Sequence, residues 1–146
     1  MSIKNRNKGL AAIFLMGCIL LGGYVFITFF LEPSKDTKRA RTEVRISSES
    51  LVSSFLVDER SANTSYVEKT IEVQGIVREI TFLNDRYTVF LHGGDELACL
   101  MCDMQADQLE QVKDLKPGQK VLLKGVCKGF LMDAILLNCV LINTNQ

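Results

Sequence analysis

From Thr70 to the end of the chain, apolar residues recur at every second position in five short runs, and this alternation constrains the fold more than any other feature. Period-two alternation is typical of strands with one buried face, and the turn residues between the runs indicate short connections. A short segment with helical spacing, "QADQLEQVKDL", separates the third run from the fourth. The predicted strands cover residues 70–77, 86–92, 96–104, 120–130 and 134–143.

A helix between the third and fourth of five strands is the arrangement of the OB-fold, a small and partly open barrel. We therefore predict an all-β domain with short helices, an OB-fold five-stranded barrel, over residues 48–146. Gly75 lies inside the first strand and predicts a bulge or a sharp bend there. Helical spacing in "SSESLVSSFLVDERSANTSY" predicts one helix ahead of the barrel, capped by Ser47 or Ser48.

The run "GLAAIFLMGCILLGGYVFITFFL", Gly9–Leu31, has 23 residues and no charge, which is long enough to span a bilayer as a helix. We predict one N-terminal transmembrane helix at residues 9–31, preceded by a basic N-tail at residues 1–8. The segment "LMGC" resembles a bacterial lipobox with Cys18 as acceptor. Because mostly apolar residues continue well past Cys18, we expect an anchor rather than a processed lipoprotein.

Residues 32–47 are charged and lack hydrophobic periodicity, which predicts a linker between anchor and domain. Residues 1–45 carry a net charge of +5 and residues 46–146 a net charge of −5. An acidic domain repels the phosphates of nucleic acid at long range. Three basic residues precede the apolar run and five follow it, so the positive-inside rule alone favours a cytoplasmic domain. The short basic tail and the large C-terminal domain are instead typical of a signal anchor, which would export the domain.

Three parts of the sequence resemble the bacterial tRNA_anti-like family of short, envelope-associated OB-fold proteins: "ANTSYVEKTIEVQGIVREI", Cys102 and "LKPGQKVLLKGVCKGFLMDAILLNCVL". The resemblance covers about residues 48–142, and the matched positions are Ala62, Tyr66, Gly75, Cys102, Gly118, Gly125, Cys127, Asp133 and Cys139. It implies an OB domain at the cell envelope. We expect a single-pass protein of the bacterial inner membrane with a periplasmic domain. Such a fold likeness implies no RNA binding by itself.

The domain contains four cysteines: Cys99, Cys102, Cys127 and Cys139. The first two form a CxxC within a predicted strand, which places them on opposite faces and disfavours a zinc site or a redox pair. No metal or cofactor is therefore expected. A hairpin turn centred near Asp133 would place Cys127 opposite Cys139 and allow a disulfide, whereas a one-residue shift of register would leave both as free thiols.

OB-folds bind ligands on the outer face of their second and third strands. On the second strand this face carries Arg86, Phe90 and His92, which are the candidate ligand-binding residues. Phe90 is either a stacking platform or a residue packed under the first helix. A lysine row on the fourth strand is either a basic surface or a solvated edge, and it comprises Lys120, Lys124 and Lys128.

The sequence contains a single histidine and no spacing typical of a catalytic triad or a metal centre, so no catalytic residues are assigned and the protein is predicted not to be an enzyme. We predict a membrane-anchored, non-catalytic, monomeric binding module for an unidentified protein or envelope component. The alternative is a nucleic-acid-binding OB-fold domain, which the acidic charge disfavours.

Overall fold

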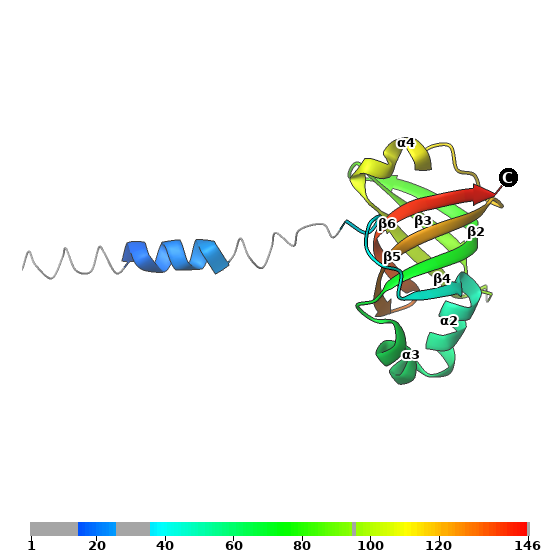
Figure 1. Cartoon of the computed structure of the whole chain (residues 1–146), viewed down its shortest axis with the longest axis horizontal. Helices are drawn as coiled ribbons and strands as arrows, with labels where there is room; N and C mark the ends of the chain where they lie inside the picture. Colours follow the sequence, from blue (N-terminus) through cyan, green and yellow to red (C-terminus); the bar gives the residue numbers. More distant parts are fainter. Residues whose placement is uncertain (1–14, 26–35, 95, 146) are drawn as a thin grey trace, which may run out of the picture. The chain divides into compact units, whose positions relative to one another are not determined.

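The computed structural model describes residues 15–25, 36–94 and 96–145, which belong to two separate units (Figure 1). In the first unit, residues 15–25 form a helix. No helix in these described ranges is both long and apolar enough to cross a membrane. The basic N-tail and the remainder of the predicted span Gly9–Leu31 lie outside the described residues.

In the second unit, five strands close into a barrel, as the sequence predicts (Figure 1). The closed circuit runs from β2 through β3, β4, β6 and β5 back to β2, and all neighbours are antiparallel except β4 and β6. Three boundaries differ from the prediction, because the first and last barrel strands end later and the third begins later. The strands are β2 (Thr70–Leu83), β3 (Arg86–His92), β4 (Cys99–Met104), β5 (Lys120–Phe130) and β6 (Ala134–Asn145).

The predicted linker is wrong over residues 36–47, which pack on the barrel. Strand β1 (Val44–Ser47) pairs in parallel with β2 from Ile71 to Gln74. Residues 36–43, here called the strap, precede β1, and the strap carbonyl oxygens of Lys38 and Ala40 accept hydrogen bonds from Lys124 Nζ. The strand "VRIS" does alternate apolar with polar residues, but four residues are the shortest run that such a pattern can indicate, and it follows directly on a charged segment.

Two helices, not one, precede the barrel: α2 (Ser48–Val57) and α3 (Glu59–Tyr66). The break falls at Asp58, whose non-helical backbone ends α2 and whose side chain caps α3 by accepting from Ser61 N at 3.1 Å. Ser47 caps α2, as predicted. The buried face of α2 joins the barrel core through Leu51, Val52 and Phe55. Between β4 and β5, the predicted short helix consists of a 3₁₀ turn (Ala106–Gln108) and α4 (Leu109–Val112).

Gly75 has a different role from the predicted bulge. The pairing of β2 with β3 shifts register between Val77 and Glu79, two residues further on. A Cβ atom at Gly75 would lie 2.5 Å from Ser48 Oγ and 2.9 Å from a methyl carbon of Leu91. The glycine therefore lets the first turn of α2 approach the barrel closely.

The register predicted for the last hairpin is also wrong. Cys127 lies opposite Leu136, and Lys124 lies opposite Val140, because the β5–β6 pairing contains three irregularities. Cys139 is consequently not across from Cys127, and all four thiols of the barrel are free. The geometry on which the predicted Cys127–Cys139 disulfide depended is absent from the hairpin.

Candidate binding face of the barrel

An apolar row crosses three neighbouring strands on the outside of the barrel. Phe90 on β3 is aligned with Met101 on β4, which is aligned with Ile135 on β6. Residues on either side of each member are fully buried in the core, so alternation directs these three side chains outward, where they are half-buried. Directly opposed side chains on paired strands lie close enough to pack against each other. The row is thus a continuous apolar strip at the surface.

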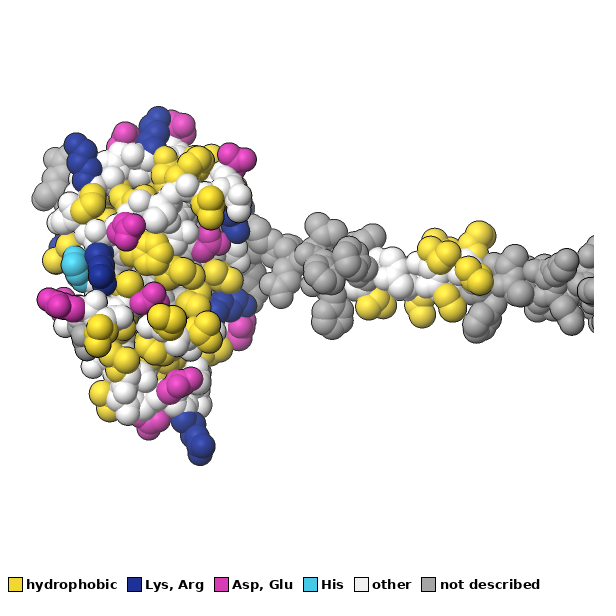
Figure 2. All heavy atoms as spheres, turned by 180° about the vertical axis from the view of Figure 1, so that it is seen from behind, with side chains coloured by type: hydrophobic (Ala, Val, Ile, Leu, Met, Phe, Trp, Pro, Cys, Tyr) yellow, Lys and Arg dark blue, Asp and Glu magenta, His cyan; other side chains and the backbone are white. Residues whose placement is uncertain are grey.

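Charged groups border this row without giving it a positive field. Arg86 Nη1 lies 3.1 Å from Asp103 Oδ2, and Arg86 remains half exposed. Glu79 is exposed and aligned with Phe90 at the β2 end of the row. Figure 2 shows a face of the domain on which hydrophobic side chains gather in the middle, with separate acidic and basic groups among them. Pairing with Asp103 leaves Arg86 a weak attractor for phosphate.

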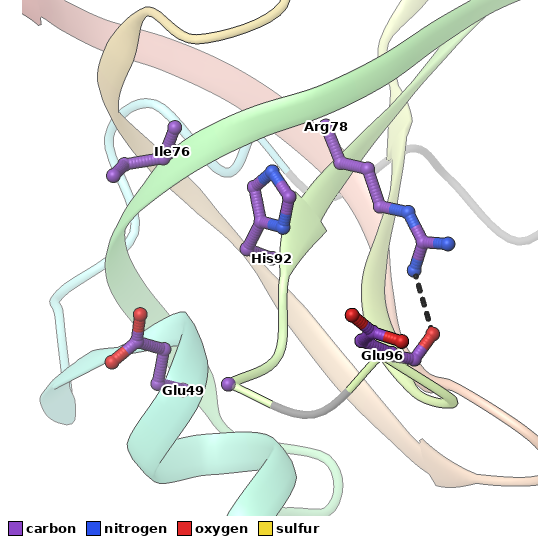
Figure 3. A pocket seen from close by; sticks show the side chains of 6 residues that line it. Glu49, Ile76, Arg78, His92 and Glu96 are labelled. Atoms are coloured by element: carbon purple, nitrogen blue, oxygen red, sulfur yellow. Dashed lines mark hydrogen bonds between the residues drawn. The ribbon is translucent and has the colours of Figure 1, made fainter.

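An open pocket of about 720 Å³ adjoins His92 at the end of β3. Its walls come from α2, β2, β3 and the following loop, and its lining residues are Glu49, Ile76, Arg78, His92, Gly94 and Glu96 (Figure 3). Arg78 Nη1 donates to the backbone oxygen of Glu96 at 3.4 Å. Ser48 Oγ donates to the backbone oxygen of His92 at 2.6 Å, which ties the pocket floor to the start of α2.

The three predicted site residues all lie on this side of the barrel, but in different surroundings. Phe90 belongs to the apolar row, Arg86 is paired with Asp103, and His92 lines the pocket. Under α2 and α3 the aromatic partner is instead Phe130, whose ring centroid lies 5.8 Å from that of Phe55. Phe90 therefore faces outward on β3, in the apolar row.

The predicted lysine row is not a continuous basic surface. Lys124 is only 6 % exposed and is occupied by the strap. Lys128 Nζ bonds to both carboxylate oxygens of Glu68, at 2.9 and 3.1 Å. Lys120 remains exposed. Two of the three amines therefore already have partners within the domain.

Cys99 lies at the edge of the face and does not supply reactive chemistry. Its thiol donates to Asp133 Oδ1 at 3.2 Å. Burial, followed by this hydrogen bond to a carboxylate, raises the pKa of Cys99 to about 11, so the thiol stays protonated at neutral pH. Within the described ranges, no three His, Cys, Asp or Glu side chains are placed to hold a metal ion.

Sequence reasoning missed Met101 and Ile135. The outward phase of β3 identified Phe90, but in "CLMCDM" and "AILLN" apolar residues occupy both phases, so alternation does not assign Met101 and Ile135 to the outside. Their alignment depends on the parallel pairing of β4 with β6, which no local pattern indicates. The row therefore becomes visible only in the folded barrel.

The sequence and the fold can be compared with known proteins. The sequence model of the tRNA_anti-like family matches residues 5–141, so the chain belongs to the tRNA_anti-like family. This confirms the resemblance found in the sequence. No curated protein sequence matches the chain.

One solved structure supports the fold, and a second is similar at a lower TM-score. A "putative nucleic acid-binding lipoprotein" from Klebsiella pneumoniae is similar with a TM-score of 0.55 and 16 % identity, over 67 % of this chain and 91 % of that protein. Asparaginyl-tRNA synthetase from Pyrococcus horikoshii is similar with a TM-score of 0.44 and 13 % identity, over 56 % of this chain but only 20 % of the synthetase. At 16 % identity the likeness to the Klebsiella pneumoniae protein shows the fold alone.

Proposed function

We propose that this protein is a non-catalytic binding module whose apolar row contacts a polypeptide ligand. The observation that supports this most directly is the alignment of Phe90, Met101 and Ile135 across three strands. Partly exposed apolar strips of this kind on an otherwise polar surface are typical of protein-binding sites. A chain lying across the row would bury all three side chains at once.

Charge favours a polypeptide over nucleic acid as the ligand. The pocket and the row together have two arginines, Arg78 and Arg86, against four carboxylates, Glu49, Glu79, Glu96 and Asp103. Affinity for nucleic acid depends on cations that neutralise phosphates and on aromatic rings that stack with bases. The row contains one aromatic ring, and the domain has a net charge of −5 over residues 46–146.

The anchor and the location of the domain belong to this proposal. The uncharged run Gly9–Leu31 supports a membrane anchor by its length and composition, and the short basic tail before it supports export of the domain to the periplasm. Fusion of alkaline phosphatase to the C-terminus tests the topology. Enzyme activity in cells is expected for an exported domain, and an inactive but full-length fusion would contradict export.

Selection of peptides tests the ligand class. Random phage-displayed peptides are selected on the compact unit 35–146, and the dissociation constants of enriched peptides are then measured. We expect Met101→Glu and Ile135→Glu each to weaken binding at least tenfold, because either change places a charge in the row. The matched control is Ile142→Glu, since Ile142 is an apolar residue that is 42 % exposed and lines a different surface pocket, beside β1. Equal losses in all three variants would contradict the assignment.

Nucleic acid is the second candidate, and the observation in its favour is the half-buried ring of Phe90 on the same face of β3 as Arg86. Fluorescence anisotropy with single-stranded DNA and RNA oligonucleotides at physiological salt distinguishes the two ligand classes. We expect dissociation constants weaker than micromolar. Tighter binding that is lost in Phe90→Ala would replace the polypeptide proposal with a nucleic-acid function.

A further inference from the structure

The strap and β1 form a basic segment on an acidic domain. Four exposed basic side chains follow one another along this segment, and they are Lys38, Arg39, Arg41 and Arg45. With the two acidic residues Asp36 and Glu43, they give residues 36–47 a net charge of +2, whereas residues 48–146 carry a net charge of −5. A negatively charged surface therefore attracts the strap and β1 and repels the remainder of the domain.

The barrel fixes the backbone of this segment without using its basic side chains. Thr37 is fully buried, and its Oγ1 accepts a hydrogen bond from Gln105 Nε2 at 3.3 Å. Lys124 Nζ donates to the carbonyl oxygens of Lys38 and Ala40. Neither contact involves an ammonium or guanidinium group of the strap. The fold therefore holds the strap in one place and leaves its positive charges at the surface.

The acidic groups beside these charges are partly occupied within the domain. Glu43 Oε1 accepts from a backbone N–H of β2 at 3.1 Å. Glu72 Oε2 accepts from Arg45 Nε at 2.8 Å, yet the Arg45 side chain remains 79 % exposed. Asp36 Oδ2 lies 3.4 Å from Arg39 Nε, and the Arg39 side chain is 89 % exposed. Such exposed pairs are weak, so both arginines can still meet another anion.

The strap also begins close to the apolar run at residues 9–31. Only five positions along the chain separate Leu31, the last residue of the proposed anchor, from Asp36. Even when fully extended, this stretch spans at most about 18 Å. Anionic lipid headgroups attract basic segments next to a membrane anchor, and the attraction falls off within a Debye length of about 8–10 Å. The proposed anchor thus brings the strap within reach of these headgroups.

We propose that the strap and β1 bind the headgroups of anionic phospholipids in the membrane that holds the anchor. This inference rests on the proposed anchor, but it does not depend on the side of the membrane on which the domain lies. Binding through the strap directs the apolar row on β3, β4 and β6 away from the bilayer. A polypeptide ligand can then reach the row while the domain stays at the membrane.

The test is chemical labelling of arginines in the full chain. The protein is placed in nanodiscs of phosphatidylcholine, or of phosphatidylcholine and phosphatidylglycerol in equal amounts, and treated with phenylglyoxal. Chymotryptic digestion and mass spectrometry give the modification rate of each arginine, with Arg41 reporting on the strap and Arg86 on the side of the row. We expect the anionic lipid to slow modification of Arg41 at least about threefold and to leave that of Arg86 unchanged. High salt should remove the difference, because it screens the charges.

A charge reversal in the strap is compared with one outside it. Arg41→Glu is expected to abolish the effect of anionic lipid on Arg39, whereas the matched control Arg60→Glu, at an exposed position on α3, is expected to retain it. In the wild-type chain, equal effects of anionic lipid on Arg41 and Arg86, or no effect on either, would overturn the strap contact and leave the anchor intact. Release of the chain from vesicles by sodium carbonate would instead contradict the anchor, and the inference with it.

Discussion

The two outer sides of the barrel differ in what lies on them. On one side, β1 and the strap pack beside β2 and β5, and they bury polar groups that include Thr70 and Lys124. On the other side, the row of Phe90, Met101 and Ile135 remains partly exposed. The domain therefore covers polar groups with its own chain and leaves an apolar strip open to solvent.

This difference indicates how each side is used. Burial of a lysine is costly unless its ammonium group is hydrogen-bonded, and the strap carbonyl oxygens supply those bonds to Lys124. Contacts within the chain therefore account for the arrangement of the strap side. The row has no comparable internal explanation, because three half-exposed apolar side chains do not require a common alignment for folding alone. The comparison supports the row as the side that meets a ligand.

The largest expected effect on stability comes from removing β1 and the strap. A chain that begins at residue 36 retains the strap and β1, whereas a chain that begins at residue 48 loses both. We expect the shorter chain to lose at least about 3 kcal/mol of unfolding free energy, because Lys124 and Glu72 lose their partners and β2 loses a paired strand. Urea unfolding followed by circular dichroism measures the difference. Equal stability of the two chains would mean that the strap side is as dispensable as a linker.

A smaller effect is expected from Lys124→Met, which keeps the chain length and removes the ammonium group. The strap carbonyl oxygens then lose their donor, and we expect a cost of about 1–3 kcal/mol. Lys128→Met is the matched control on the same strand, because Lys128 makes a surface ion pair with Glu68 that is worth less than about 1 kcal/mol. Limited proteolysis should cut the strap faster in Lys124→Met only. Similar losses of unfolding free energy in both variants would contradict a specific role for Lys124.

The sequence predicted the part of the molecule in which local patterns are strong. The five barrel strands and the helix between the third and fourth follow from alternation and turn residues, and the family match supports the same reading. Strand β1 was not predicted, because its four residues form a strand only through pairing with β2, which lies more than 20 positions further along the chain. The break between α2 and α3 was missed because Asp58 interrupts a segment whose apolar spacing continues as far as Ala62.

The candidate face was predicted only in part, for a physical reason. Strand β3 alternates apolar with polar residues, so its outward positions Arg86, Phe90 and His92 could be recognised. In "CLMCDM" and "AILLNC" apolar residues occupy both phases, and alternation cannot distinguish the inside from the outside. The same limit applies to the cysteines, because irregular pairing of β5 with β6 places Leu136, and not Cys139, opposite Cys127.

The smallest expected effect concerns the loss of folding stability at acid pH, through Glu72 on the strap side of the barrel. Hydrogen bonds from Thr42 Oγ1 and Arg45 Nε, at 2.6 and 2.8 Å, hold the pKa of Glu72 below its usual value of 4.5, while burial opposes them. A carboxyl group with a lowered pKa stabilises the fold above its unfolded-state pKa, and this contribution disappears as the pH falls through the folded-state pKa. Glu72→Gln is therefore expected to be less stable than the wild type at pH 7, and the gap should narrow below about pH 4.5.

The size of that gap should stay below about 1 kcal/mol, because Arg45 is 79 % exposed and water screens its charge. Urea unfolding of both proteins between pH 7 and pH 3 measures it. Thr42→Val removes the hydrogen bond with the largest effect on the Glu72 pKa, so its stability should depend on pH less steeply than that of the wild type over the same range. Parallel stability curves for the wild type and Glu72→Gln down to pH 3 would show that the strap does not depend on the ionised carboxylate. The contrast between the two sides would then rest on Lys124 and β1 alone.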